Sequence, residues 1–192
     1  MSEIFVSIDC ESNGPVPGLY SMLSIGAVAF NSQGEEIAEF SVNLEPLPDA
    51  QEHPETMNFW KSQPEAWAVV NQNKVRPILA TKQFDVWLRK LPGPITVICW
   101  PTSFDFPFVH YYLVRFTGES YIGHTALDIK SLAAAVVGKY SRTVGKKDLL
   151  AEHKPKTKHT HVAVEDAREQ GEIFFMLRAE LEKRRQEAEN RG

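Results

Sequence analysis

The distribution of hydrophobic and polar positions divides the chain into short strand-like runs and longer segments with helical periodicity. Apolar or alternating runs predict β-strands at residues 3–10, 22–31, 36–45, 95–100 and 121–124. Apolar positions three and four residues apart predict helices at residues 55–62, 64–72, 78–91, 105–117, 127–137, 145–152 and 161–187. This order predicts an α/β fold with a five-stranded mixed sheet, three antiparallel N-terminal strands and flanking helices.

Residues that start or stop regular structure support these boundaries. The turn at residues 31–34 ends in Gly34, which tolerates a positive φ, and it predicts a hairpin between the second and third strands. Pro54, Pro64 and Pro77 each fall in the first turn of a predicted helix. A proline is favoured there because its missing N–H would have no partner within the helix in any case.

Length and composition are those of one ordinary globular domain. The chain has 192 residues, of which 43% are hydrophobic and 24% are charged. No linker-like or low-complexity tract divides it, and no internal repeat is visible. We therefore expect a single domain at residues 1–187, followed by a charged C-terminal tail at residues 188–192.

The chain carries no sign of membrane insertion or secretion. A charge-free tract at residues 12–34 is interrupted by Pro15 and Pro17 near its start, whereas a membrane span requires an unbroken apolar helix. The acidic N-terminus does not resemble a signal peptide. Cys10 and Cys99 are the only cysteines, which excludes a secreted disulfide framework. We expect a cytoplasmic protein with no membrane partner.

Asp9 and Glu11 stand two residues apart at the polar end of the first predicted strand. Residues i and i+2 of a strand project from the same face, roughly 6.5 Å apart. Two like charges at that distance repel each other unless a positive group lies between them, and a divalent metal bound by oxygen ligands is the simplest candidate. The alternative is an exposed edge strand with two solvated acids, which is the commoner origin of an isolated Asp-x-Glu pattern.

Two later clusters supply what a metal site would need. Asp105 follows the buried strand at residues 95–100 and opens an apolar helical segment. His161 and Asp166 lie five residues apart at the start of the last helical pattern, so on a helix they would be offset by about 140°. His161 would lie at or just before the first turn, where it can reach the same reacting water without sharing a helix face with Asp166.

Four carboxylates in this order, with a histidine five residues before the last, resemble the DEDDh branch of the DnaQ-like 3'-5' exonucleases, which includes ribonuclease T and oligoribonuclease. The resemblance covers nearly the whole chain and implies a ribonuclease H-like fold. One position departs from the pattern. Many relatives have an asparagine a few residues before the Asp of the second motif, where this chain reads Trp-Pro-Thr-Ser at residues 100–103. That departure bears on the subfamily more than on the chemistry.

The resemblance implies a role for each of these side chains. Two Mg²⁺ or Mn²⁺ ions would be held by Asp9, Glu11, Asp105 and Asp166. Two ions roughly 3.5–4 Å apart can stabilise both the attacking and the leaving oxygen of an in-line phosphoryl displacement. His161 would act as the general base, a task that suits an imidazole with a pKa near neutrality. A helix-start cap is the structural alternative for His161.

The same resemblance implies a nucleic acid with a free 3' end as substrate. Candidate contacts to its terminal nucleotide are Ser12, Asn13, Tyr20, Leu23 and Trp60. An aromatic stacking face is worth about 1–3 kcal/mol per base, although core packing is an equal alternative for Trp60. The Trp-Lys-Ser-Gln-Pro stretch at residues 60–64 is similar to small bacterial and phage exoribonuclease-like members, which favours RNA over DNA.

The overall charge of −4 is unusual for a protein that binds nucleic acid. Basic side chains are nevertheless concentrated before His161, namely Lys139, Arg142, Lys146, Lys147, Lys154, Lys156 and Lys158. We interpret this basic stretch as a phosphate-guiding loop, with a solvated surface as the alternative. Relatives of this size often form homodimers in which one subunit contributes basic residues to its partner's site, so a homodimer is a further possibility.

Two other functions remain compatible with the sequence. A proofreading-type exonuclease that acts on DNA would use the same catalytic residues and would read the 3' end through similar stacking and backbone contacts. A non-catalytic nucleic-acid-binding member of the fold would have lost the chemistry. The presence of all five catalytic positions argues against the latter, because clustered carboxylates without a metal cost stability.

Overall fold

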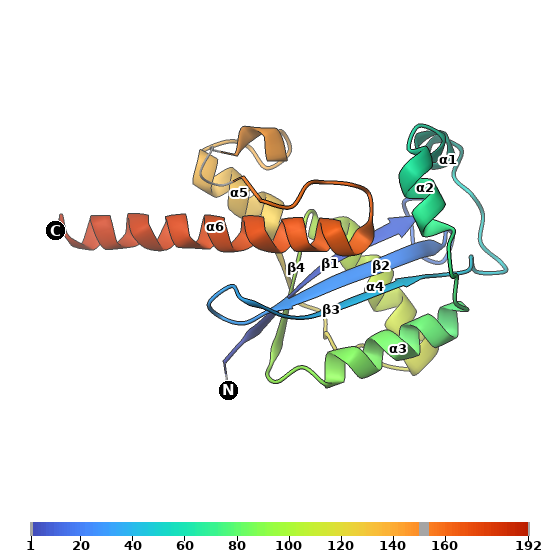
Figure 1. The fold of residues 1–192 in the computed structure, drawn as a ribbon. Helices are drawn as coiled ribbons and strands as arrows, with labels where there is room; N and C mark the ends of the chain where they lie inside the picture. Colours follow the sequence, from blue (N-terminus) through green and yellow to red (C-terminus); the bar gives the residue numbers. More distant parts are fainter. Residues whose placement is uncertain (1, 150–153, 192) are drawn as a thin grey trace.

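A computed structural model describes residues 2–149 and 154–191 (Figure 1). The sheet order is β3-β2-β1-β4-β5. β1, β2 and β3 are antiparallel neighbours, whereas β4 runs parallel to β1 and β5 runs parallel to β4. The strands are β1 (Ile4–Ser12), β2 (Met22–Phe30), β3 (Glu36–Asn43), β4 (Ile95–Cys99) and β5 (Ala126–Asp128). The predicted five-stranded mixed sheet with three antiparallel N-terminal strands is confirmed.

Helices cover both faces of this sheet. In Figure 1, α5 and α6 lie on one face, α3 and α4 lie on the other, and α1 and α2 stand beyond the C-terminal end of β1. The helices are α1 (Pro54–Lys61), α2 (Pro64–Val70), α3 (Pro77–Arg89), α4 (Thr102–Thr117), α5 (Ile129–Val137) and α6 (Ala163–Glu189), with a short 3₁₀ turn, η1 (Lys146–Asp148). Proline occupies the first turn of α1, α2 and α3, as the sequence predicted.

The central strand β1 contributes to a hydrophobic core on each side of the sheet. Ile4, Val6 and Ile8 face the cluster that is completed by α3 and α4. Phe5 faces the opposite cluster, which is completed by α5 and α6. Successive strand residues point to opposite faces, so a strand that is covered on both sides reads as a continuous apolar run. The apolar run ends at Asp9, whereas Cys10 beyond it still belongs to the core.

A glycine allows α6 to approach the sheet next to this point. Gly26 on β2 pairs with Asp9 on β1. A Cβ atom at Gly26 would lie 2.1 Å from the carbonyl carbon of Ala163, in the first turn of α6. The absence of a side chain at Gly26 therefore allows the N-terminal turn of α6 to rest on the sheet beside Asp9.

Two predicted elements differ from the structure. Residues 121–124 form a turn in which Gly123 has a positive φ of 66°, and the fifth strand follows at Ala126–Asp128. The helix predicted at 145–152 is only η1, because Leu149 has an extended backbone with ψ of 140°. The end of that predicted helix lies outside the described residues.

Several helix boundaries also differ from the prediction. The last helix begins at Ala163 instead of residue 161, since His161 has a φ of +58° that a right-handed helix does not accommodate. α4 begins at Thr102, before the expected residue 105. α5 begins at Ile129, where the Asp128 side chain accepts a hydrogen bond from the N–H of Ser131 and caps the helix.

Neither cysteine participates in a disulfide, and both are buried in the core between the sheet and α4. The two side chains thus serve as small core residues. Within the described part of the chain, none of the helices combines the length and the hydrophobicity needed to cross a membrane.

Candidate active site

The structure brings three of the predicted carboxylates together at the end of β1. One oxygen from each of Asp9, Glu11 and Asp166 lies within 4.8 Å of the others. Asp9 and Glu11 project from the same face of β1, and Asp166 reaches them from the first turn of α6, which Gly26 allows to lie close. Three carboxylate oxygens at this spacing form a suitable donor set for a hard divalent cation such as Mg²⁺ or Mn²⁺.

The electrostatics of this cluster also fit a cation. Burial raises the pKa of Asp9 well above its ordinary value, and the charges of Asp105 and Asp166 raise it further. Burial, followed by the charges of Asp9 and Asp166, has the same effect on the pKa of Glu11. The ionised forms of both side chains are thus unfavourable in the protein alone, and a bound divalent cation would relieve that cost.

Asp105 is held against the same strand from the other side. It lies in the first turn of α4, is 2% exposed, and its Oδ1 accepts a 2.9 Å hydrogen bond from the backbone N–H of Cys10. Burial raises the pKa of Asp105, and the charge of Glu11 raises it further, although the Cys10 N–H opposes this effect. Asp105 therefore lies beside β1 at Cys10, close enough for its charge to act on Asp9 and Glu11, but outside the group of three carboxylates whose oxygens lie within 4.8 Å of one another.

The turn before Asp105 lacks the asparagine that is common in relatives and is held by other groups. Asp128 Oδ2 accepts a 2.8 Å hydrogen bond from the backbone N–H of Thr102. The hydroxyl of Thr102 donates to the carbonyl oxygen of Leu127 at 2.9 Å. Because Asp128 also caps α5, one side chain fixes the starts of α4 and α5 together.

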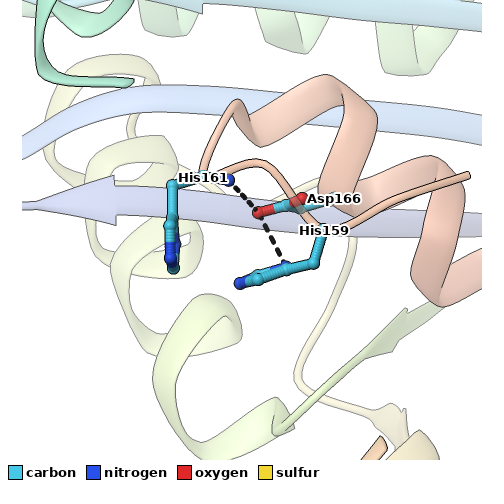
Figure 2. A group of neighbouring side chains, drawn as sticks. All are labelled: His159, His161 and Asp166. Atoms are coloured by element: carbon cyan, nitrogen blue, oxygen red, sulfur yellow. Dashed lines mark hydrogen bonds and ion pairs between the residues drawn. The ribbon is translucent and has the colours of Figure 1, made fainter. Parts of the chain in front are cut away.

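Asp166 is surrounded by the loop that leads into α6. Its Oδ1 accepts the N–H of Thr160 at 2.8 Å, and its Oδ2 accepts the N–H of His161 at 2.9 Å. His159 Nδ1 lies 3.0 Å from the same Oδ2 (Figure 2). Burial alone would raise the pKa of Asp166, but the hydrogen bonds from His159 and Thr160 lower it below its ordinary value. Asp166 is therefore ionised at neutral pH.

His161 lies between two aromatic rings beside this carboxylate. Its ring centroid is 5.1 Å from that of Phe59 and 4.4 Å from that of His159, with edge-to-face geometry in both cases. Burial and the positive charge of His159 lower the pKa of His161. A neutral imidazole can accept a proton, so the environment of His161 suits a general base.

A second set of polar residues supports the cluster and was not predicted from the sequence. Gln170 Nε2 donates to Asp9 Oδ1 at 2.6 Å, while Gln170 Oε1 accepts the N–H of Trp100 at 2.8 Å. Lys146 forms an ion pair with the buried Glu169, and Glu169 Oε2 is also 3.3 Å from His159 Nδ1. Asp166 and Glu169, through their hydrogen bonds, raise the pKa of His159 to about 9.

Helical spacing in the sequence could have identified two of these supporting residues. Glu169 and Gln170 lie three and four residues after Asp166, so all three share one face of α6. Lys146 was noted in the sequence only as one charge of the basic stretch, and its pairing with Glu169 was not predicted. No signal existed for His159, because it lies in an irregular segment of the chain.

An open pocket of about 560 Å³ adjoins Glu11. It is lined by Glu11, Ser12, Pro15, His53, Glu55, Thr56, Phe59, Trp60 and Phe104. Phe59 is 39% exposed, and its ring also contacts that of His161. The pocket thus extends from the carboxylates to an exposed aromatic side chain on α1, which the sequence analysis did not identify.

The predicted stacking residues Leu23 and Trp60 are core residues in this structure. Each is 2% exposed, and both belong to one hydrophobic cluster with Ala66 and Val70. The indole N–H of Trp60 donates to the carbonyl oxygen of Ser12 at 2.9 Å. Core packing, the alternative considered for Trp60, is what the structure has, and neither side chain presents a face on which a base can stack.

The other three predicted contact residues shape the loop after β1. The Ser12 hydroxyl donates to the carbonyl oxygen of Gly14 at 2.7 Å, and Asn13 Oδ1 accepts the N–H of Ser21 at 2.7 Å. Tyr20 packs over Gly14 and contacts the ring of His53 edge-on at 5.5 Å. These interactions fix the wall of the pocket. A direct contact between these side chains and a substrate stays a prediction.

Some side chains of the basic stretch form ion pairs, and others are exposed on the surface. Lys139 pairs with Asp148 at 2.7 Å, and Lys146 pairs with Glu169 beside the site. Lys154, Lys156 and Lys158 are exposed on the loop that leads to His161. The loop thus carries three exposed positive charges, and Lys154 and Lys156 line a separate pocket with Glu36, Arg168 and Glu172.

Comparison with known proteins identifies the family. Residues 5–177 match the model of the Rv2179c-like 3'-5' exoribonuclease domain, and this range contains all five predicted catalytic residues. The chain is also 35% identical over 191 residues to the 3'-5' DNA exonuclease Cap18 of Escherichia coli, which covers 95% of this chain and 96% of that protein.

Solved structures with low sequence identity share the fold. The nuclease domain of 3'hExo, a DEDDh family member bound to rAMP, matches with a TM-score of 0.67 at 11% identity over 93% of this chain and 92% of that one. Schizosaccharomyces pombe Pop2p, in a form with Mg²⁺ and Mn²⁺ bound, gives a TM-score of 0.67 at 16% identity over 91% and 82%. E. coli exonuclease I with a dA16 oligonucleotide gives 0.68 at 12% identity over 94% and 42%. The chain has the ribonuclease H-like fold that it shares with the DEDDh exonuclease 3'hExo, and it belongs to the Rv2179c-like 3'-5' exoribonuclease domain family.

Proposed function

We propose that this protein is a metal-dependent 3'-5' exonuclease that releases nucleoside monophosphates from the 3' end of RNA. The observation that carries the proposal is the meeting of Asp9, Glu11 and Asp166 within 4.8 Å, at the mouth of an open pocket. Asp105 and His161 complete the set from α4 and from the loop before α6. A non-catalytic member of the fold would gain nothing from four neighbouring, mutually repelling carboxylates, of which Asp105 and Asp166 are buried.

The four carboxylates fit the divalent ions that the family implies. Asp9, Glu11 and Asp166 would hold one Mg²⁺ or Mn²⁺, and Asp9 would hold a second with help from Asp105 through water. When bound, such ions polarise the phosphate and stabilise the charges that develop on the attacking and leaving oxygens. The raised pKa values of Asp9 and Glu11 support this assignment, since the carboxylates need a compensating cation in order to be ionised.

His161 is assigned as the general base. It would accept a proton from the water that attacks the terminal phosphodiester. Its lowered pKa keeps the ring neutral at physiological pH, and the edge-to-face contact with Phe59 orients it. The hydrogen bond from its backbone N–H to Asp166 couples its position to the carboxylate cluster.

The open pocket is assigned to the 3'-terminal nucleotide. Phe59 and Phe104 line it, and an aromatic ring stacks on any base with similar affinity. They replace Leu23 and Trp60 as candidates for base stacking. The exposed lysines of the loop before His161 would then contact the phosphates of the upstream strand.

DNA is the second candidate substrate, because the relative that matches 95% of this chain at 35% identity is a DNA exonuclease. The test uses single-stranded RNA and DNA of one sequence, labelled at the 5' end and incubated with Mg²⁺ or Mn²⁺. A ladder that shortens from the 3' end is expected, faster for RNA. Faster shortening of DNA would select the second candidate.

Two further results of the nuclease assay bear on the proposal. A 3'-blocked oligonucleotide of the same sequence should stay intact, and cleavage inside it would contradict an exonuclease. Intact substrates with every metal would favour the non-catalytic alternative. Light scattering at several protein concentrations tests the proposed homodimer.

A further inference from the structure

A second group of potential metal ligands shares Asp166 with the carboxylate cluster. One ligand atom from each of His159, His161 and Asp166 lies within 4.8 Å of the others. Figure 2 shows both imidazole rings beside the carboxylate, with the ring of His159 directed toward that of His161. The carboxylate cluster offers oxygen alone, whereas this group offers two imidazole nitrogens and one oxygen.

The two groups differ in the metals that they favour. Mg²⁺ prefers oxygen ligands and binds imidazole weakly, whereas Zn²⁺ takes histidine nitrogen and carboxylate oxygen readily. Zn²⁺ also binds a given nitrogen-containing site more tightly than Mn²⁺ does. The ligand chemistry therefore directs Mg²⁺ to Asp9 and Glu11, and Zn²⁺ to the histidine pair.

The observed distances are close to those that a zinc ion needs. Bonds of about 2.0–2.1 Å in a tetrahedron place ligand atoms roughly 3.3 Å apart. His159 Nδ1 is 3.0 Å from Asp166 Oδ2 and 3.3 Å from Glu169 Oε2. A ring nitrogen of His161 lies within 4.8 Å of the ligand atoms of both His159 and Asp166, and the two imidazole centroids are 4.4 Å apart. Lys146 lies near His159 Nδ1, but its charge is balanced by the ion pair with Glu169.

We propose that Zn²⁺ binds to His159, His161 and Asp166 and thereby inhibits the nuclease. Two separate effects follow from occupancy. Asp166 is withdrawn from the cluster that holds the catalytic ions, and the lone pair that His161 needs as a base is engaged by zinc. His159 releases its proton to solvent when Nδ1 accepts the metal. The binding half of this proposal stands alone, and the inhibition half rests on the proposed nuclease function.

Direct binding is tested with Co²⁺ as a spectroscopic substitute for Zn²⁺. A four-coordinate site with histidine ligands absorbs strongly in the visible range, whereas an octahedral all-oxygen site absorbs weakly. The full chain should show this band at one equivalent, and Zn²⁺ should remove it. His159→Gln and His161→Gln should each lose the band, while His124→Gln, an exposed histidine before β5, should keep it. A band of equal strength in all variants would overturn the site.

Inhibition is tested by titrating Zn²⁺ at fixed millimolar Mg²⁺, with each variant compared with its own zinc-free rate. The Zn²⁺ concentration that inhibits the enzyme should rise roughly 10- to 100-fold in His159→Gln. Substitution of residues around a metal site lowers metal affinity by about this factor, and loss of a ligand should lower it at least as much. The inhibitory concentration should not change in His124→Gln. Equal sensitivity of His159→Gln and wild type would place the inhibitory zinc at Asp9 and Glu11 and overturn the proposal.

Two measurements separate the possible failures. If the protein showed no nuclease activity with Mg²⁺ or Mn²⁺ but kept the Co²⁺ band, the proposed function would be wrong and the site would stand. Activity without the band, or without inhibition by zinc, would refute the inference alone. Thermal unfolding of each variant establishes that a lost band does not reflect a misfolded protein.

Discussion

The ionised carboxylate of Asp9 is disfavoured both by burial and by the neighbouring negative charges. Burial and the charges of Asp105 and Asp166 all raise its pKa, and the compensating interactions are a hydrogen bond from Gln170 and the charges of Lys146 and His159. The carboxylate is therefore retained at a cost in stability that a bound cation would remove.

This balance gives the first prediction. Asp9→Asn should abolish nuclease activity, because an amide brings no negative charge to the metal. The metal-free variant should be no less stable than wild type, since the substitution removes repulsion and keeps an oxygen that accepts from Gln170. Thermal unfolding with a chelator measures the stability. Added Mg²⁺ should raise the unfolding temperature of wild type more than that of the variant. Turnover near the wild-type rate would contradict the metal assignment.

The second prediction concerns His161. His161→Ala should lower the turnover rate by roughly 10²–10⁴-fold, the usual contribution of a positioned general base. The Mg²⁺ concentration for half-maximal activity should change little, because His161 is not a ligand of the catalytic ions. Single-turnover rates across a Mg²⁺ titration separate the two quantities. A variant that kept its rate at saturating Mn²⁺ while losing metal affinity would show that His161 is a ligand.

At the scale of elements, the site depends on the contact between β2 and the first turn of α6. A Cβ atom at Gly26 would lie 2.1 Å from backbone atoms of both Ala163 and Val164. Backbone cannot rotate away as a long side chain can, so α6 would have to move from the sheet. Asp166 lies within that first turn, and any such movement separates it from Asp9.

Gly26→Ala should therefore reduce activity and stability together. Overpacking of this kind costs typically 1–3 kcal/mol, measured here as the free energy of unfolding in urea. The matched control is Gly145→Ala, because a Cβ atom there would meet its nearest neighbour at an ordinary 3.9 Å. An unchanged activity in Gly26→Ala would mean that the position of α6 does not determine the geometry of the site.

The elements that the sequence failed to predict are short and held by tertiary contacts. β5 pairs with β4 over only three residues, so its own pattern is too brief to read. The helix expected from residue 145 is only η1, because Leu149 is extended, and tertiary contacts such as the ion pair between Asp148 and Lys139 hold this segment. The longer strands and helices, by contrast, are buried on a consistent face, and their periodicity records that burial.

At the scale of the whole molecule, the residues of the site also divide into those that the sequence predicts and those that it does not. The four acids and His161 were predictable because strand alternation and family spacing fix them. The contacts of Gln170 with Asp9 and of Lys146 with Glu169 were not predicted, because each joins segments distant in sequence. His159 was not predicted either, because it lies near Asp166 in a loop that has no periodic pattern. Leu23 and Trp60 were assigned to the substrate because the sequence does not distinguish an aromatic core cluster from an exposed platform.

The distribution of charge over the molecule leads to the last prediction. Lys154, Lys156 and Lys158 stand exposed on the loop that enters the site. If they guide the phosphate backbone, replacing all three with Ala should weaken binding of long substrates. Each lost contact should reduce the slope of log affinity against log salt by about 0.7 for a single strand. Turnover of a dinucleotide should barely change, because so short a substrate does not reach the loop.

The comparison between long and short substrates shows whether the loop lysines contact the upstream phosphates. A control variant with the same net charge shows whether any effect depends on the position of the lysines. Replacing Lys82, Lys90 and Lys183 with Ala removes the same net charge from exposed positions on α3, just after it and on the end of α6, away from the site. That control should leave the salt slope unchanged. Equal losses on dinucleotide and long strand would place the loop lysines at the reacting phosphate. No loss on either would identify the loop as a solvated surface, and the upstream strand would then have to follow another path from the pocket.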